Sequence, residues 1–514
     1  MTATLSLAAV LAESARRFPD KVAVIDREAR ITYTDLWRQA LAYAGHLREM
    51  GVGTGDTVAL LAPNVAEFPR AYYGILAAGA TVVPVHLLLT APEMAYVLRD
   101  SGANLLVCDA SQLATGTVAA AEAGIRAVSV GDRTDGHGDA GRLDASGGTP
   151  LSTYASRRPD DIAVVFYTSG TTGQPKGAEL SHLNLVMNAT VNVFDANDSR
   201  RDDVALGCLP LFHIFGQSVS MNGTFRLGAT LVLLARFTGD AAIEAMVREH
   251  VTVFHGVPTM YVGLLEAATG REALPKLRLC ISGGASLPVA VLERFNAAFS
   301  TTVYEGYGLS ETSPTATTNQ PDFGVRPGTI GNPVWGVDVE IARAEVEDRV
   351  ELLPAGELGE IVMRGHNIFA GYRGRPEATA EAIVDGWFRS GDLGSKADNG
   401  SITIVDRKKD LIIRGGFNVY PREVEEVLAR HPAIAQVAVI GIPDDVHGED
   451  ICAVVLLDRT VDVKPTEDEL IEWSRERLGR HKYPRHVRFV DELPLGPSHK
   501  VLKRELRRMI AEEA

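Results

Sequence analysis

A glycine- and hydroxyl-rich segment at 168–177 has the residue types needed to bind a polyphosphate. Its glycines let the backbone curl so that several N–H groups point at one anion, and Lys176 adds a mobile positive charge. A Walker A loop is excluded, because Pro175 and Gly177 flank that lysine where the motif requires a glycine and a hydroxyl residue. An exposed loop with a solvated lysine is the alternative. The expected phosphate-binding residues are Thr168, Ser169, Gly170, Thr171, Thr172 and Gly173.

Two further segments place polar groups beside apolar runs. Ser282–Ala285 follows the apolar run 277–281, and glycines at the carboxyl end of a strand permit close approach of a flat base or a carboxylate. In the segment 304–312, Tyr307 can stack on a base, and Glu311 is a hard oxygen ligand suited to Mg²⁺. The alternative for residues 282–285 is a tight strand–helix turn, and the alternative for Glu311 is an ordinary exposed carboxylate.

Asp392 lies in a glycine turn, between Gly391 and Gly394, that follows an aromatic strand-like run. One carboxylate can accept hydrogen bonds from both vicinal hydroxyls of a ribose, so this residue is a candidate ribose ligand. A carboxylate that caps its own turn is the alternative. His213 ends the apolar segment 209–213, where a histidine buried in the core is the simplest interpretation.

The strands and helices that must position these residues are indicated by two alternating patterns in the sequence. Short β-branched runs alternate with stretches of helical spacing over the first 300 residues, which predicts βαβ units and mainly parallel sheets. A helix is expected after Ser286, with its apolar residues on one face. The segment 131–150 has six glycines and four aspartates, which predicts a surface connection with neither strand nor helix. The expected strands are 22–25, 58–61, 81–85, 105–107, 161–167 and 230–234.

The pattern changes near Asp406, where the charged cluster 407–410 separates two apolar runs. A Gly415-Gly416 turn follows, and then a mixture of short helices and strands typical of a small α+β unit. We therefore predict two domains, residues 1–408 and 409–514.

Length and composition exclude several classes of protein. A chain of 514 residues is expected to form about three folding units, and 46% hydrophobic with 23% charged residues is typical of a globular protein. The net charge of −15 disfavours a nucleic-acid binder. The four cysteines are widely spaced, which excludes a zinc ribbon or a disulfide scaffold and favours a reducing cytoplasm. No apolar run is long enough to predict a transmembrane segment.

The string Tyr-Thr-Ser-Gly-Thr-Thr-Gly-Gln-Pro-Lys-Gly at 167–177 resembles the phosphate signature of the adenylate-forming superfamily. That superfamily comprises acyl-CoA synthetases, luciferases and the adenylation domains of peptide synthetases, and the chain is most similar to fatty acyl-CoA synthetases over about residues 10–510. The resemblance implies an α/β fold. It consists of a large N-terminal domain of layered α/β sheets, a small β-barrel-like subdomain, and a small mobile α+β C-terminal domain.

The resemblance also implies roles for individual residues. Lys176 and Lys500 would be catalytic, the latter in adenylation, and His213 would border the acyl tunnel. Glu311 would bind Mg²⁺, Asp392 and Arg407 the ribose, and Lys409 would be the hinge of the C-terminal domain. Gly415 and Gly416 would line the channel for the pantetheine arm of CoA. The other residues implied to bind the nucleotide or the acyl carboxylate are Gly283, Gly284, Ala285, Glu305, Tyr307, Gly308 and Ser310.

The sequence departs from the family pattern at two of these motifs. Ser310 replaces a threonine but keeps the hydroxyl, whereas His499 stands where the family has glycine beside the catalytic lysine. Histidine adopts positive φ less readily than glycine, so this loop would have fewer conformations available.

The implied reaction joins a carboxylic acid to CoA through an acyl-adenylate, with ATP, Mg²⁺ and CoA, and releases AMP and pyrophosphate. Gly263 stands where malonate-specific relatives have an arginine, which favours a medium- or long-chain monocarboxylic fatty acid. Two alternatives are an enzyme that loads another acid or an amino acid on a carrier protein, and a non-catalytic nucleotide-binding relative. We expect a cytoplasmic monomer or homodimer without nucleic-acid partners.

Overall fold

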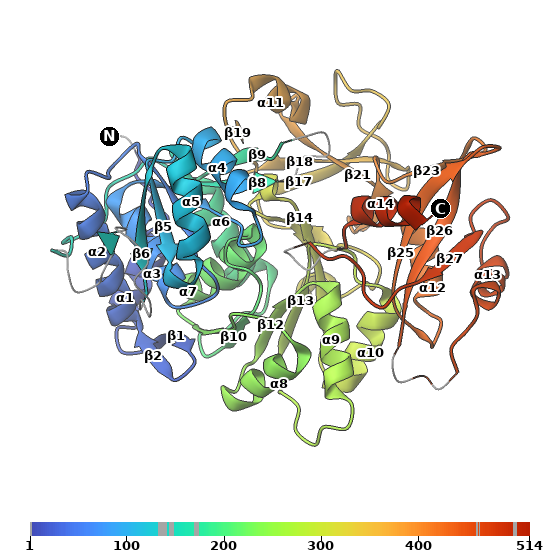
Figure 1. Cartoon of the computed structure of the whole chain (residues 1–514), viewed down its shortest axis with the longest axis horizontal. Coiled ribbons are helices and arrows are strands. Elements are labelled where there is room, and N and C mark those ends of the chain that lie inside the picture. Colours follow the sequence, from blue (N-terminus) through green and yellow to red (C-terminus); the bar gives the residue numbers. More distant parts are fainter. Residues whose placement is uncertain are drawn as a thin grey trace.

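The computed structural model describes residues 3–131, 141–142, 149–168, 174–458, 461, 463–496 and 501–513. These residues form four β-sheets with helices packed against them (Figure 1). The predicted α/β fold is confirmed. Among the described helices, none is both long enough and apolar enough to cross a membrane.

The first sheet contains nine strands within the described residues and is parallel at its centre. In spatial order these strands are β16 (Asn332–Pro333), β15 (Thr315–Thr318), β14 (Val303–Gly308), β13 (Leu279–Ser282), β12 (Val253–Gly256), β10 (Val204–Gly207), β11 (Thr230–Leu233), β1 (Val22–Asp26) and β2 (Ala29–Thr32).

The second sheet contains eight strands within the described residues and is also parallel at its centre. In spatial order these are β19 (Gly371–Tyr372), β9 (Lys176–Ser181), β8 (Ile162–Thr168), β4 (Thr81–Pro84), β3 (Thr57–Leu61), β5 (Leu105–Asp109), β6 (Arg126–Val130) and β7 (Gly141–Arg142). The expected strands in both sheets are therefore confirmed.

Strand β7 contradicts the prediction that 131–150 contains no strand. Its backbone pairs with β6, through Val128 with Gly141 and Ser129 with Arg142. Pairing at a sheet edge uses only main-chain N–H and C=O groups, so a glycine-rich segment can form it without an apolar pattern.

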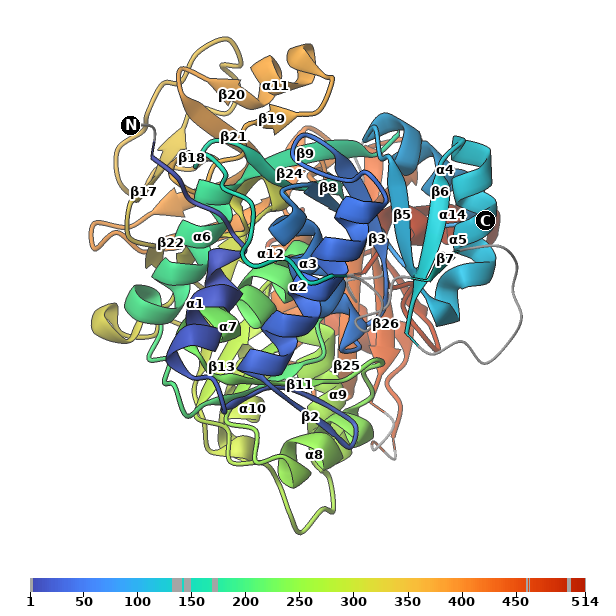
Figure 2. The same ribbon diagram turned by 90° about the vertical axis from the view of Figure 1, so that its left-hand side faces the viewer.

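The second sheet is buried on both faces, because its side chains alternate between two cores. Val58 and Leu60 pack into one core with α2 and α3, while Ala59 and Leu61 pack into the other with α4 and α5. Figure 2 shows the two helix layers on either side of the strands. The described helices before residue 400 are α1 (Ala9–Arg17), α2 (Tyr33–Glu49), α3 (Glu67–Ala78), α4 (Ala91–Asp100), η1 (Ala110–Gln112), α5 (Leu113–Ala123), α6 (His182–Val191), η2 (Asn192–Ala196), η3 (Phe215–Asn222), α7 (Gly223–Leu227), α8 (Gly239–Arg248), α9 (Pro258–Ala268), α10 (Val289–Phe299), η4 (Ser310–Thr312), η5 (Pro321–Phe323) and α11 (Pro376–Ala382).

The third sheet is antiparallel and forms the small β subdomain. It contains β17 (Val337–Ala342), β18 (Gly359–Gly365), β21 (Trp387–Lys396), β20 (Ile383–Val384) and β22 (Ile402–Arg407). Strand β22 carries the chain from this sheet into the C-terminal part.

The C-terminal part has its own sheet and two hydrophobic clusters, whose described members all lie at or after Ile412. The sheet contains β24 (Phe417–Val419), β23 (Ile412–Arg414), β26 (Gly448–Leu457), β25 (Ile434–Asp444) and β27 (His486–Phe489), with helices α12 (Pro421–Leu428), α13 (Glu467–Arg475) and α14 (Lys503–Glu513). In Figure 1 this red part lies at one end of the long axis, and β14, β18 and β21 lie between it and the blue N-terminal half.

Candidate active site

The predicted phosphate loop joins two antiparallel strands at their paired ends. Thr168 ends β8, Lys176 begins β9, and the two residues are register partners. Lys176 is half-buried, and its Nζ lies 5.2 Å from the centroid of the Tyr372 ring in β19. The residues Ser169, Gly170, Thr171, Thr172 and Gly173 lie outside the described residues, so their predicted role stays a prediction.

Glu311, the predicted metal ligand, meets the same tyrosine. Its carboxylate is buried, and its Oε1 accepts a 2.8 Å hydrogen bond from the Tyr372 hydroxyl. Burial raises the pKa of Glu311, and the tyrosine hydroxyl and the charge of Arg407 oppose that rise. A carboxylate with one hydroxyl donor keeps further lone pairs for a hard cation, so the donor chemistry fits Mg²⁺.

Tyr372→Phe is expected to raise the Mg²⁺ concentration needed for half-maximal adenylation by about tenfold, as losing a partner of a metal ligand commonly does. The phenylalanine keeps the ring beside Lys176 but cannot donate to Glu311. Pyrophosphate exchange measured over a magnesium titration tests this. An unchanged magnesium requirement would show that Tyr372 does not orient Glu311.

Asp392 and Arg407, predicted to bind the ribose, are brought together with Tyr307. They are register partners in β21 and β22, and Arg407 Nε lies 3.2 Å from Asp392 Oδ1. The Tyr307 hydroxyl donates a 2.6 Å hydrogen bond to the other carboxylate oxygen, Oδ2. Asp392 is 4% exposed. An aromatic residue and a carboxylate, both of which a nucleoside can use, are thus in contact.

The glycine loops allow close backbone contact beside this cluster. A Cβ on Gly283 would lie 3.2 Å from the Phe215 ring, and a Cβ on Gly308 would overlap the carbonyl of Pro314. Gly284 adopts φ of +79°, which favours glycine, and is exposed. Ala285 and Ser310 are half-buried in the same two segments.

The contacts of Glu305 are with residues outside the Tyr307 cluster. Its Oε1 accepts a 3.1 Å hydrogen bond from Leu287 N, and Arg422 of α12 lies 3.9 Å from the same oxygen. Its Oε2 has no hydrogen-bond partner among the described residues. Glu305 therefore supports the loop that follows Gly283 and contacts the C-terminal part, and its predicted role in nucleotide binding stays a prediction.

The stability of the protein is expected to fall as pH rises through neutrality because of Glu305. Burial raises its pKa to about 7. The folded state therefore binds a proton between about pH 4.5 and 7 that the unfolded state has lost, and this stabilisation disappears as pH rises through 7. Glu305→Gln should flatten this part of the profile, worth on the order of 1–3 kcal/mol. Thermal denaturation of both proteins between pH 5 and 8 tests this, and parallel profiles would contradict it.

His213 precedes the π-helix η3 and is half-buried. Its Nδ1 accepts a 3.3 Å hydrogen bond from Phe215 N, and the preceding residue, Phe212, packs its ring 4.6 Å from that of His86. Because Phe215 also approaches Gly283, η3 begins beside the glycine loop. This position is compatible with the predicted acyl pocket.

The predicted hinge and CoA channel lie on the surface. Lys409 is exposed, and Gly415 and Gly416 form the exposed turn between β23 and β24, with φ of +56° and +82°. Lys500 and His499 lie outside the described residues.

Sequence reasoning missed Tyr372 and Arg422. Tyr372 lies between Gly371 and Arg373, outside any apolar period, and a lone aromatic beside glycine was its only signal. Arg422 carries no local signal, because its partners lie in other elements: its N donates to Asp406 Oδ2 and its Nη1 to Ile404 O.

Comparison with known proteins identifies the family. The family described as AMP-binding enzyme matches residues 11–373, and its C-terminal domain matches residues 423–500. The chain belongs to the AMP-binding enzyme family. The predicted membership of the adenylate-forming superfamily is thereby confirmed.

Three relatives illustrate the range of this AMP-binding enzyme family. The chain is 39% identical over 500 residues to a feruloyl-CoA synthase from Amycolatopsis, covering 96% of this chain and 97% of that protein. It is 35% identical over 538 residues to a long-chain-fatty-acid–CoA ligase from Bacillus subtilis, covering 98% and 94%. The structure of the anthranilate CoA ligase AuaEII with anthranoyl-AMP superposes with a TM-score of 0.92 at 25% identity, covering 100% and 99%.

The protein is accordingly an AMP-forming acyl-CoA ligase that acts through an acyl-adenylate. Its small-molecule substrates are a carboxylic acid, ATP and CoA, and it uses Mg²⁺, as the sequence predicted.

Proposed function

We propose that Lys176, Glu311, Asp392 and Arg407 form the adenylation site of this ligase. The observation that carries the proposal is the convergence of Lys176 and Glu311 on the single side chain of Tyr372, which is only partly buried. Glu311 would hold Mg²⁺, which supplies positive charge to the phosphates when bound. Lys176 adds a second positive charge beside it, and Asp392 accepts from the ribose hydroxyls.

In the first half-reaction, a carboxylate oxygen of the acid attacks the α-phosphorus of ATP, and the bond to pyrophosphate breaks. Lys176 stabilises the charge that develops on the phosphates. In the second, the thiol sulfur of CoA attacks the acyl carbon and AMP leaves. We propose that residues 409–514 turn about Lys409 between these steps, so that Lys500 serves the first and the Gly415-Gly416 turn the second.

A medium- or long-chain fatty acid is the first candidate substrate. It is supported by the relative named long-chain-fatty-acid–CoA ligase and by the glycine, rather than an arginine, at position 263. Gly263 lies on α9, is half-buried and faces Phe237. A glycine at this position offers no side chain to pair with a second carboxylate.

A compact acid with a polar substituent, such as a hydroxylated aromatic acid, is the second candidate. This candidate is supported by the relative named feruloyl-CoA synthase, to which the chain is 39% identical over 500 residues.

A competition assay separates the candidates. Octanoate, palmitate, benzoate and ferulate are compared by kcat/KM for AMP release with CoA. A fatty acid with the highest value supports the first candidate, and ferulate with the highest value supports the second. ATP-dependent transfer of the acid to a carrier protein but not to CoA would overturn both.

A further inference from the structure

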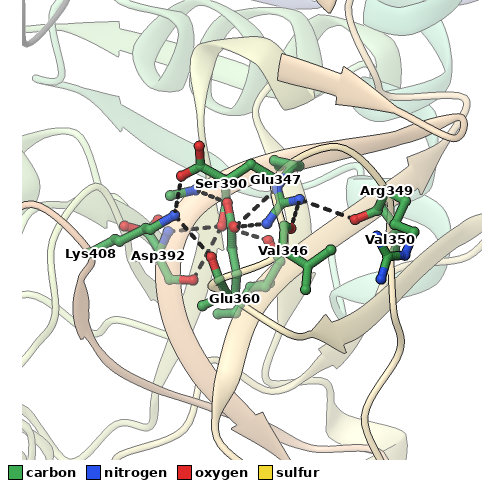
Figure 3. Close-up of polar contacts among 12 residues, drawn as sticks. Val346, Glu347, Arg349, Val350, Glu360, Ser390, Asp392 and Lys408 are labelled. Atoms are coloured by element: carbon green, nitrogen blue, oxygen red, sulfur yellow. Dashed lines mark hydrogen bonds and ion pairs between the residues drawn. The ribbon is translucent and has the colours of Figure 1, made fainter. Parts of the chain in front are cut away.

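A buried ion pair between β21 and β18 contacts the turn that presents Asp392. Figure 3 shows Glu360 of this pair beside Ser390 and Asp392. Arg389 of β21 donates to Glu360 Oε2 of β18 from both Nε and Nη2, at 3.1 Å and 2.6 Å. The two side chains are 7% and 4% exposed. Burying two charges costs free energy, so such a pair is weak evidence for stability and calls for another explanation.

The second oxygen of Glu360 holds the backbone of the turn. Glu360 Oε1 accepts a 3.0 Å hydrogen bond from Gly391 N, and Gly391 adopts φ of +72°. On the other side, Ser390 Oγ accepts a 3.0 Å bond from Asp392 N and donates to Ile361 O at 2.7 Å. The backbone N–H groups of Gly391 and Asp392 are therefore both held, the first by Glu360 of β18 and the second by Ser390, which is itself bonded to β18.

Arg389 and Lys408 also hold the loop after β17. Arg389 Nη1 donates to Val346 O at 2.6 Å, and Lys408 Nζ donates to Glu347 Oε1 and Ala344 O, both at 2.9 Å. Lys408 N also donates to Gly391 O. Arg389 and Lys408 thus join this loop to the residues on either side of the Gly391 turn, and the turn carries the side chain that pairs with Tyr307 and Arg407.

We propose that Glu360 and Arg389 are positioning residues for nucleotide recognition: they hold the Gly391 turn so that Asp392 meets the ribose hydroxyls. The proposal rests on the ribose-binding role of Asp392 in the proposed function. Neither residue touches the nucleotide itself. Their effect is geometric, because the carboxylate of Asp392 can accept from two vicinal hydroxyls only in one orientation.

Discrimination between ATP and its deoxy analogues tests the proposal. The ratio of kcat/KM for ATP to that for 2′-deoxyATP or 3′-deoxyATP is measured by pyrophosphate exchange, and the ratio of Kd values by calorimetry. The wild type is expected to favour ATP about tenfold or more, as the loss of one charge-assisted hydrogen bond predicts. Glu360→Gln should lower this ratio toward one, mainly by raising KM for ATP. A role confined to folding would lower activity with all three nucleotides equally.

A second variant separates positioning from stability. Glu360→Leu combined with Arg389→Met replaces the ion pair by apolar side chains, a change that is often neutral for stability. It removes the acceptor for Gly391 N, so discrimination should still be lost while the melting temperature is retained. Wild-type discrimination in either Glu360 variant that folds overturns the proposal. Asp338→Asn is the matched control, because its 2.8 Å pair with Arg364 joins β17 to β18 but is exposed.

Asp392→Ala separates failure of this inference from failure of the proposed site. If it abolishes discrimination while the Glu360 variants keep it, only the positioning role is wrong. If Asp392→Ala keeps discrimination, the ribose assignment is wrong and the inference fails with it.

Discussion

Replacing Glu311 by alanine is expected to reduce the rate of acyl-adenylate formation by about 10³-fold, because a catalytic metal supplies several kcal/mol of charge stabilisation. The phosphates of ATP would lose their metal anchor, and the Tyr372 hydroxyl would lose its acceptor. Pyrophosphate exchange with a saturating acid measures this half-reaction directly.

Glu311→Gln sharpens this test. Glutamine keeps an oxygen that can accept from Tyr372 but carries no charge, so it should lose nearly as much activity as alanine while preserving the packing. Thioester formation from supplied acyl-AMP is expected to change much less, since it involves no pyrophosphate. A glutamine variant with the full exchange rate would exclude Glu311 as the metal ligand.

Replacing Lys500 by alanine is expected to slow adenylation by about 10²–10³-fold, by analogy with the loss of one donor to a developing anion. Its charge is required where the carboxylate attacks phosphorus. The same variant, supplied with preformed acyl-AMP, should form the thioester at nearly the normal rate. The two half-reactions are assayed separately.

The matched variant is Gly416→Asn, because asparagine tolerates a positive φ and adds a side chain to an exposed turn. It should form acyl-AMP normally and slow attack by the thiol, which is the reverse pattern. Equal losses in both half-reactions for Lys500→Ala would mean that one static arrangement serves both steps, and the rotation about Lys409 would have to be abandoned.

Features that depend on neighbours in the chain could be predicted from the sequence. The buried parallel strands were found because their apolar runs are short, β-branched and separated by helical stretches. The glycine turn around Asp392 was expected from the spacing of its glycines, and the structure adds that Gly391 adopts a positive φ there. Asp392 and Arg407 were both named before their contact was visible, because each lies in a motif that resembles the family pattern. Their contact comes from the pairing of β21 with β22.

Features that depend on the order of strands were decided by the tertiary structure alone. Tyr372 reaches Glu311 because β19 pairs with β9 at the edge of one sheet, while Glu311 follows β14 of another. Glu360 holds Gly391 only because β18 and β21 are neighbours. Glu305 lies in a motif that resembles a nucleotide-binding motif, yet its carboxylate contacts Leu287 N and Arg422. Side-chain direction and long-range pairing follow from which elements pack together, and residue type and spacing do not specify that.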